Sequence, residues 1–221
     1  MRWFAEHGRE FPWRKASANN YELIVAELLL QRTRAETVAS FFSQFVREFP
    51  SWKRLGSASI PQLQSHLQPI GLWRRRATSI QALAQEMAKR RGRFPKDRDE
   101  IETLPGIGQY IASAILLFCH NIPEPLIDVN MTRVLERVYR PRQLVDIRYD
   151  PYLQSLARRV VGCMWSKELN WAILDLAALV CVAGQPQCNV CPLARICSYY
   201  DKEMLLPSSQ NGFVMGQDNE S

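Results

Sequence analysis

The sequence of 221 residues contains no apolar run long enough to cross a membrane. Its most apolar segments, IASAILLFC and AILDLAALVCVAG, fall short of the roughly 20 residues that a bilayer requires, and Asp175 interrupts the second one. The first residues, MRWFAEHGREFPW, carry charges throughout and lack the apolar stretch and small-residue cleavage site of a secretory signal. We therefore expect an intracellular, cytoplasmic protein that has no membrane partner.

The expected compartment determines how the six cysteines are interpreted. Thiols stay reduced inside cells, so we do not expect disulfides. Four of the cysteines follow the spacing C-x6-C-x2-C-x5-C within CVAGQPQCNVCPLARIC, and they are Cys181, Cys188, Cys191 and Cys197. Four thiolates in one tight loop suit either a [4Fe–4S] cluster or a structural zinc, and the ligand type alone does not separate the two. The other two, Cys119 and Cys163, lie in apolar helical surroundings and are expected in the core.

The sequence also lacks alternating strand patterns and internal repeats, which favours an all-α fold and excludes a solenoid. Apolar residues recur instead at helical spacing. The predicted helices are Tyr21–Arg34 (with Asn19 or Asn20 as N-cap), Ala35–Glu48, Ser59–Leu67, Arg75–Arg91, Ile107–His120, Met131–Tyr139, Pro151–Gly162 and Leu169–Val182. Residues 207–221 are polar and patternless, and we expect them to form a mobile tail.

Positive charge exceeds negative charge, with 28 lysines and arginines against 22 acidic residues, a formal net charge of +6. The excess is concentrated in residues 71–98, where nine basic residues face only Glu86 and Asp97. A solvated helical face and a phosphate-binding surface both account for such a run. A basic balance of this kind favours polyanionic partners without identifying one.

The stretch LPGIGQYIASAI at residues 104–115 places a proline and two glycines before an apolar helical run. Gly106 and Gly108 permit a tight turn and leave the main-chain N–H groups of the next helix open to an anion, such as a DNA phosphate. An ordinary turn between two helices is the simpler interpretation of this glycine pattern.

The longer string IETLPGIGQYIASAIL resembles the helix-hairpin-helix of base-excision DNA glycosylases. Downstream, LIDVNMTRVLERVY, which contains Asp128, resembles the catalytic segment of that superfamily. The cysteine spacing is similar to the cluster loop of the endonuclease III and adenine-mismatch glycosylase families, which favours the [4Fe–4S] cluster over zinc. The resemblance covers roughly residues 10–202, nearly the whole chain.

This resemblance implies a two-lobed, all-α helix-hairpin-helix glycosylase fold with an active site in the cleft between the lobes. We expect a six-helix lobe at residues 19–136 and an iron–sulfur cluster lobe formed by residues 1–18 and 137–206. The implied partner is double-stranded DNA containing a mismatched base, and the chain is expected to act as a monomer. The implied phosphate contacts lie in the hairpin, at Gly106, Ile107, Gly108 and Gln109.

Three residues are expected to carry the chemistry of base release. Breaking an N-glycosidic bond develops positive charge on the sugar, and the carboxylate of Asp128 would stabilise it; an N-cap is the alternative role for this residue. Glu27 lies in the apolar run IVAELLL, where the family places a glutamate that faces the base; a structurally paired glutamate is the alternative. Tyr110 occupies the position where bifunctional relatives carry a lysine nucleophile, and packing of the hairpin helix is its alternative role.

An enzyme that extrudes a base must also fill the hole left in the duplex. By their positions relative to the family's wedge residues, Arg32 and Leu72 are expected to do so, whereas a solvated helix end and a core position are their alternative roles.

The strings LLQRT and CSYYDK and the tyrosine at Tyr110 are similar to the thymine-mismatch branch of the superfamily. We therefore expect a monofunctional DNA glycosylase that excises thymine or uracil mispaired with guanine and leaves an abasic site. One alternative is an adenine-DNA glycosylase without the domain that reads 8-oxoguanine. Another is a DNA-binding damage sensor without catalysis, against which the presence of both Asp128 and Glu27 argues.

Overall fold

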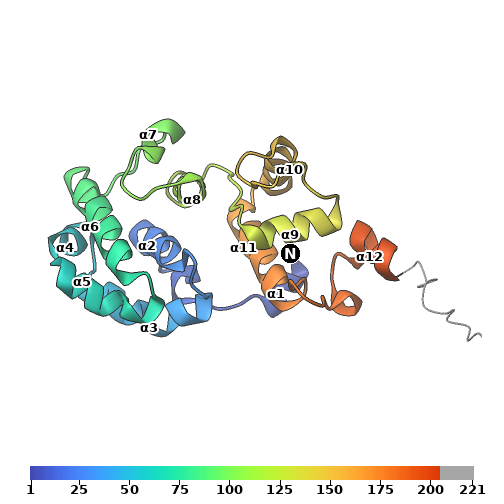
Figure 1. Ribbon diagram of the computed structural model, residues 1–221, viewed down its shortest axis with the longest axis horizontal. Coiled ribbons are helices and arrows are strands. Elements are labelled where there is room, and N and C mark those ends of the chain that lie inside the picture. The colour runs from blue at the N-terminus through green and yellow to red at the C-terminus, as the bar shows by residue number, and fades with distance from the viewer. Residues whose placement is uncertain (205–221) are drawn as a thin grey trace, which may run out of the picture.

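The computed structural model describes residues 1–204, and within this range all regular elements are helices (Figure 1). The all-α, two-lobed prediction is confirmed. The helices of the first lobe are α2 (Asn20–Leu30), α3 (Ala35–Glu48), α4 (Trp52–Ser57), α5 (Ile60–Leu67), α6 (Trp73–Lys89), α7 (Arg98–Glu102) and α8 (Gln109–His120). The helices of the second lobe are α1 (Arg2–His7), α9 (Val129–Val138), α10 (Pro151–Val161), α11 (Ser166–Leu179) and α12 (Ser198–Met204). The tail expected at residues 207–221 lies outside the described residues.

Local signals explain where several helices begin. Asn19 caps α2 in a reciprocal capping box with Glu22, and Ser59 caps α5 ahead of a proline in its first turn. The bounds predicted for α3 match the observed ones, and those of α10 differ by one residue. Short helices such as α1, α4 and α12 were not predicted, because one or two turns carry too little periodicity to recognise.

The predicted helix at residues 21–34 extends too far, because α2 ends at Leu30. The chain turns at Arg32, whose φ of 57° is left-handed. The guanidinium of Arg76 takes the carbonyls that a longer helix would have used, including those of Leu28 and Gln31. A cation from α6, more than 40 residues away, thus ends α2.

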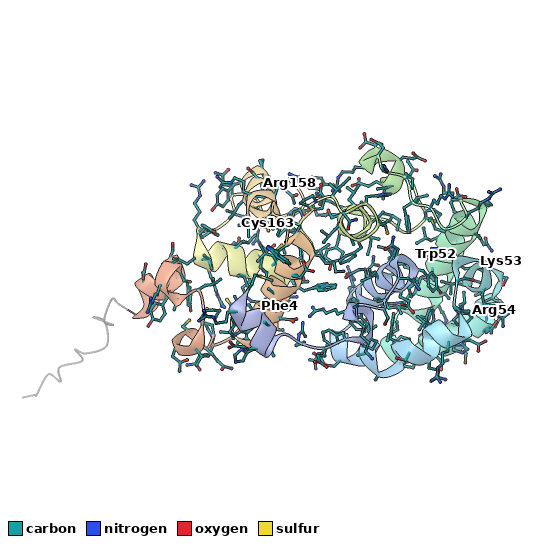
Figure 2. The ribbon with its side chains drawn as sticks, turned by 180° about the vertical axis from the view of Figure 1, so that it is seen from behind. Phe4, Trp52, Lys53, Arg54, Arg158 and Cys163 are labelled. Carbon is teal, nitrogen blue, oxygen red and sulfur yellow. The ribbon has the colours of Figure 1, made fainter. Side chains whose placement is uncertain are left out.

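Each lobe has its own hydrophobic core. The first core is built around fully buried side chains of α2, α3, α5, α6 and α8, including Phe42, Leu63 and Ile115. The second core joins α9, α10 and α11 through residues such as Met131 and Leu153. Figure 2 shows the lobes from behind, with Trp52 in the first and Cys163 in the second.

The chain crosses between the lobes near its N-terminus and again before α9. In α1, Trp3 packs against the second core, whereas Phe4 packs against the first. The second crossing is fixed by Asn170 of α11, whose fully buried amide bonds the N–H of Leu126 and the carbonyl of Glu124. These contacts hold the two lobes at a defined spacing.

The limits expected for the lobes, residues 19–136 against residues 1–18 with 137–206, stay a prediction. Packing alone assigns Phe11 and Trp13 to the first core and helix α9 to the second. No helix in residues 1–204 combines the length and the apolar content needed to span a membrane.

Candidate active site

Helices from both lobes line one wide groove of about 2900 Å³, including the space at its open mouth. Eight of the residues expected at the site line this groove, namely Glu27, Arg32, Leu72, Gly106, Gly108, Gln109, Tyr110 and Asp128. Ile107 differs, because its side chain is buried in the first core and its N–H bonds to the carbonyl of Leu104. The groove therefore brings together residues that lie up to 101 positions apart in the sequence, from Glu27 to Asp128.

Glu27 lies on α2, in a stretch where seven consecutive residues are buried. Its side chain is only 4% exposed, and its Oε2 accepts a hydrogen bond of 3.0 Å from the hydroxyl of Tyr110. Burial raises the pKa of Glu27 to about 7, while the Tyr110 bond and the positive charge of Arg14 oppose that rise. A substantial fraction of Glu27 is therefore protonated at neutral pH.

Asp128 is the N-cap of α9. Its Oδ1 accepts hydrogen bonds from the N–H groups of Asn130 (2.9 Å) and Met131 (2.8 Å), and its Oδ2 accepts one from the Asn130 amide (2.7 Å). These three donors fix the orientation of the carboxylate at the N-terminus of α9. Asp128 is thus a cap and, in the same position, a charged group on the groove wall.

Tyr110 lies in the first turn of α8 and packs partly against the first core. Burial raises its pKa well above the usual value, and the negative charges of Glu27 and Asp128 raise it further. The phenol therefore remains protonated and donates to Glu27. Tyr110 can therefore both pack the hairpin helix and take part in the site.

The hairpin places α7 and α8 on either side of the two glycines. Gly106 has a φ of 73°, and a Cβ there would collide with the side chain of Ser79, so this position requires glycine. Gly108 has an extended backbone, and a Cβ there would meet no atom within 4 Å beyond its chain neighbours, so the fold does not require glycine at this position. No side chain caps the first amides of α8, whose N-terminus faces the groove.

Two loops on the first lobe each present one exposed residue in the left-handed region. These residues are Arg32, with a φ of 57°, and Leu72, with a φ of 52°. Leu72 is 58% exposed, so the alternative of a core position is wrong. A non-glycine residue in this conformation costs about 1–3 kcal/mol, and it persists only where the surroundings impose it.

The basic run at residues 71–98 does not form a single surface. Arg76 is buried, Arg90 pairs with Glu86, and Arg98 pairs with Glu124. The groove lining contains seven arginines and three acidic residues, and two of the arginines, Arg9 and Arg14, pair with the buried Asp175. The seven arginines are Arg9, Arg14, Arg32, Arg34, Arg75, Arg76 and Arg148. Such a lining attracts a polyanion.

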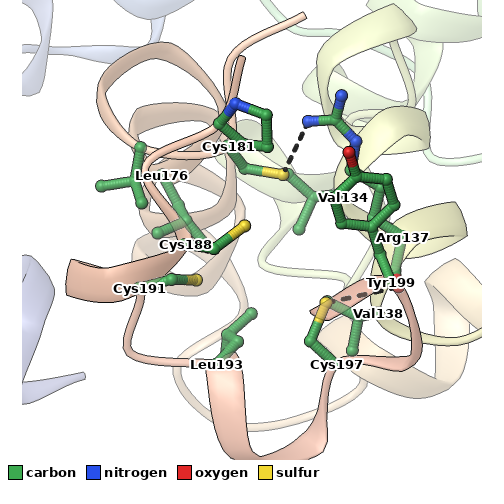
Figure 3. Close-up of a pocket in the computed structure, with 12 residues that line it drawn as sticks. Val134, Arg137, Val138, Leu176, Cys181, Cys188, Cys191, Leu193, Cys197 and Tyr199 are labelled. Carbon is green, nitrogen blue, oxygen red and sulfur yellow. Dashed lines mark hydrogen bonds between the residues drawn. The ribbon is translucent and has the colours of Figure 1, made fainter. Parts of the chain in front are cut away.

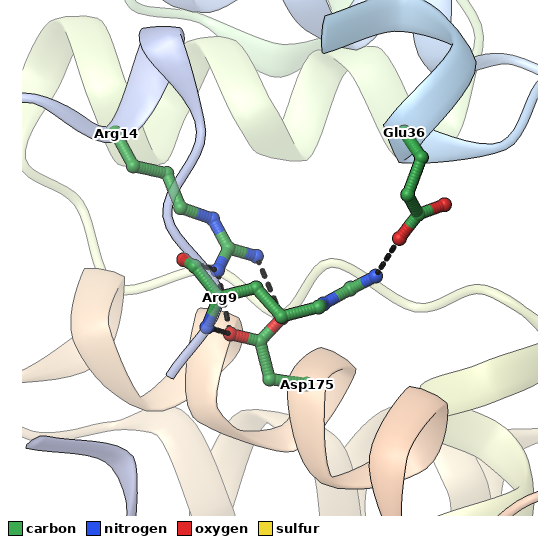
Figure 4. Close-up of polar contacts among 4 residues, drawn as sticks. All are labelled: Arg9, Arg14, Glu36 and Asp175. Carbon is green, nitrogen blue, oxygen red and sulfur yellow. Dashed lines mark hydrogen bonds and ion pairs between the residues drawn. The ribbon is translucent and has the colours of Figure 1, made fainter. Parts of the chain in front are cut away.

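A network of polar contacts contributes Arg9, Arg14 and Glu36 to the groove lining (Figure 4). The carboxylate of Asp175, fully buried on α11, pairs with Arg9 (2.8 Å) and Arg14 (2.7 Å). Arg9 also reaches Glu36 on α3 at 3.0 Å, so the network joins the two lobes. No local pattern in the sequence predicts the roles of these arginines; the one available signal is Asp175, a charge inside an apolar helix.

The four clustered cysteines line one hollow of about 320 Å³, including its open side (Figure 3). Arg137 lies beside them, with Nη1 3.5 Å from the sulfur of Cys181. Burial raises the pKa of Cys188, and the neighbouring thiols of Cys197 and Cys181 raise it further. Within residues 1–204, no three cysteine, histidine or acidic side chains lie close enough to hold a single metal ion.

The two remaining cysteines differ from each other. Cys119 is half-buried and packs against the first core, as expected. Cys163 was expected in the core but is exposed in the turn between α10 and α11, because the helix ends at Val161 and the apolar face ends with it.

Comparisons with known proteins agree with this geometry. Residues 25–148 match the model of the HhH-GPD superfamily of base excision DNA repair proteins. A thymine/uracil-DNA glycosylase of Pyrobaculum aerophilum is 39% identical over 210 residues, covering 91% of this chain and 90% of the relative. A thymine-DNA glycosylase of Aeropyrum pernix is 37% identical over 208 residues, covering 92% of this chain and 93% of the relative.

Among solved structures, that of a thermostable thymine-DNA glycosylase is similar to the structure of this chain. The TM-score is 0.77 at 26% sequence identity, with 88% of this chain and 89% of the other chain covered. The similarity extends over both lobes and the groove between them.

Proposed function

Because this chain belongs to the HhH-GPD superfamily of base excision DNA repair proteins, we propose that it is a DNA glycosylase that removes thymine or uracil mispaired with guanine and leaves an abasic site. One observation carries the proposal: a buried glutamate bonded to a tyrosine lies in the same groove as a helix-capping aspartate. The names of the two relatives, which align with nine-tenths of this chain, support the choice of base.

Asp128 stabilises the sugar as the glycosidic bond breaks. The transition state carries positive charge on the sugar ring, and an anion already oriented by three hydrogen-bond donors need not reorganise to meet that charge. The same carboxylate can orient the attacking water. Asp128 thus acts in its charged form.

Glu27 acts on the departing base. A pyrimidine leaves as an anion spread over its ring nitrogen and carbonyl oxygens, and a neutral carboxylic acid stabilises that anion by donating a hydrogen bond. A pKa of about 7 keeps part of Glu27 protonated at neutral pH. Tyr110 positions this acid through its hydroxyl.

The reaction ends at the abasic site without cleaving the strand. A lyase step requires an amine that attacks the sugar, and Tyr110 has none. In the part of the chain that the structure describes, no lysine lines the groove. Hydrolysis by water is therefore the proposed route.

Duplex DNA is held by the arginine lining and by the first amides of α8, with Gly106, Ile107, Gly108 and Gln109 forming the turn that presents them. Arg32 and Leu72 fill the space that the extruded base vacates. One copy of the chain supplies both walls of the groove, so we propose that it acts as a monomer.

Cys181, Cys188, Cys191 and Cys197 would hold a [4Fe–4S] cluster. The residues fit this group, because four thiols and no other potential ligands surround one hollow, with an arginine beside them. A single zinc ion would draw the sulfurs to about 2.3 Å from one point. A cluster places its own iron and sulfide atoms between the thiolates and so accommodates a wider spacing. When bound, it would hold together the loop that runs from Cys181 to Cys197 after α11.

The proposal is tested by incubating the protein with duplexes that contain T·G, U·G, A·G, A·8-oxoguanine or T·A pairs, and then adding alkali to cleave abasic sites. We expect cleavage only from T·G and U·G, and no strand break before alkali. Release from the A·G duplexes would instead identify an adenine-mismatch glycosylase. Binding to a mismatch without any release would identify a damage sensor, and a borohydride-trapped complex would identify a lyase.

A further inference from the structure

The two left-handed residues at the groove belong to loops that lie 40 positions apart. Arg32 follows the last turn of α2, and Leu72 is the N-cap of α6. Both side chains are exposed, and both line the groove. Arg91 and Asn121 are also left-handed, but neither lines the groove. Such conformations persist only where the surroundings impose them.

A set of hydrogen bonds centred on Thr33 joins the two loops. Its Oγ1 accepts a bond of 3.1 Å from Nη2 of Arg76, a residue one turn into α6. The same hydroxyl can donate to the carbonyl of Ile70 at 3.3 Å or to that of Gln31 at 3.4 Å. Thr33 follows Arg32 directly in the sequence, and its partner Ile70 lies two residues before Leu72. Thr33 thus bonds to both loops.

Arg76 anchors this set in the first core. It is buried, and its guanidinium also bonds the carbonyls of Leu28 and Gln31 at the end of α2. These bonds occupy backbone groups that a continuing helix would have used, so the chain must turn at Arg32. Since Arg76 lies on the helix that begins after Leu72, one side chain fixes the position of both loops.

We propose that Thr33 and Arg76 form a latch that holds Arg32 and Leu72 preformed as one double wedge for base extrusion. The inference rests on the proposed function, and it assigns a positioning role to two residues that do not contact the reacting atoms. A preformed wedge enters the duplex without first ordering two loops, so the latch raises the population of extruded base rather than the overall affinity for DNA.

The test compares Thr33→Val, which removes the hydroxyl at nearly constant shape, with Thr33→Ser, which keeps it. Both are made in an Asp128→Asn background, so that the base remains attached while extrusion is measured. The probe is a T·G duplex with 2-aminopurine beside the thymine, because its fluorescence rises when the neighbouring base unstacks. Thr78→Val is the matched control, since the Thr78 hydroxyl bonds only within α6, to Arg74.

We expect Thr33→Val to lower the equilibrium constant for base extrusion about tenfold. This is the order of magnitude expected when a left-handed residue is no longer held in place. Thr33→Ser and Thr78→Val should extrude like the parent protein, and all variants should bind a matched T·A duplex alike. Because Thr33 is partly exposed, Thr33→Val should retain the melting temperature of the parent within a few degrees.

Extrusion by Thr33→Val equal to that of the parent would overturn the latch. So would a loss of extrusion in Thr33→Ser or Thr78→Val equal to that in Thr33→Val, because the hydroxyl between the loops would then not be the cause. A parent protein that does not extrude thymine from T·G at all would instead refute the proposed function, so the two failures are distinguishable.

Discussion

The two walls of the groove present one carboxyl group each, in opposite environments. Glu27 lies in the apolar wall of the first lobe, where its one side-chain partner is the hydroxyl of Tyr110. Asp128 lies at the start of a helix on the second lobe, where two backbone amides and the amide of Asn130 donate to it. Burial in the first environment raises the pKa of Glu27 to about 7, whereas the second environment fixes the orientation of Asp128 through three hydrogen-bond donors. Burial and helix geometry, rather than residue type, therefore assign the two roles.

Removing the charge of Asp128 from the second wall should have the largest effect on base release. Asp128→Asn keeps the N-cap, since asparagine caps helices as well as aspartate, but it should lower base release by about 10³-fold or more while mismatch binding persists. Asp97→Asn is the matched control, because Asp97 caps α7 through the same kind of bond outside the groove lining. Single-turnover release that stays within a fewfold of wild type would show that Asp128 is only a cap.

The stability of the second wall should also depend on the cysteine loop, whereas the stability of the first wall should not. Helix α9 is bonded to that loop through Arg133, whose Nε donates to the carbonyl of Cys181 at 2.8 Å. Cys197→Ala should therefore lose most of its iron and melt at a lower temperature, because metal binding and folding of the lobe are coupled. Cys163→Ala, a change at an exposed cysteine outside the hollow, should leave both unchanged. Stoichiometric zinc without iron in the wild-type protein after anaerobic purification would refute the cluster.

The pKa of Glu27 makes the stability of the first wall depend on pH. A carboxyl group whose pKa rises from about 4.5 to about 7 on folding stabilises the folded state at low pH, and this contribution is lost as pH rises through about 7. Relative to Glu27→Gln, which does not titrate, the wild type should lose about 3 kcal/mol between pH 4 and pH 8. Denaturant titrations at several pH values measure this difference, with Glu10→Gln as the control at an exposed site. A constant difference would mean that folding does not shift the pKa of Glu27.

Substitutions at the two hairpin glycines of the first wall should have smaller effects, and the two should differ in how much stability they lose. Gly106→Ala should lower the stability by about 1–2 kcal/mol, because alanine is strained at a φ of 73° and Ser79 must move. Gly108→Ala should lower the stability by only about 0.5 kcal/mol, because alanine is a poorer N-cap than glycine. It should weaken binding to all duplexes alike, since its Cβ would stand where a phosphate approaches. Equal losses of stability in the two variants would remove the argument that Gly108 serves DNA.

Helices with a regular apolar period were predictable from the sequence, as α3 and α10 show. The end of α2 was not, because Arg76 imposes it from more than 40 residues away. Short helices such as α4 were missed because they depend on packing against α6 rather than on their own pattern.

The site likewise contains some residues that were selected from the sequence and others whose roles depend on contacts with distant residues. The resemblance of local strings to a known family selected Glu27, Tyr110 and Asp128, and the structure brings all three to one groove. The pairing of Asp175 with Arg14 spans 161 positions, so no local pattern can reveal it. The exposure of Leu72 likewise depends on how its loop meets the groove.

The pH dependence of base release tests the division of roles most directly. Single-turnover release from a U·G duplex is measured between about pH 5.5 and about pH 9 for wild type and Glu27→Gln. The wild-type rate should fall as pH rises through about 7, because Glu27 loses its proton, and the Glu27→Gln rate should be lower and flat across that limb. The same falling limb in both proteins would contradict the assignment of Glu27 as the acid.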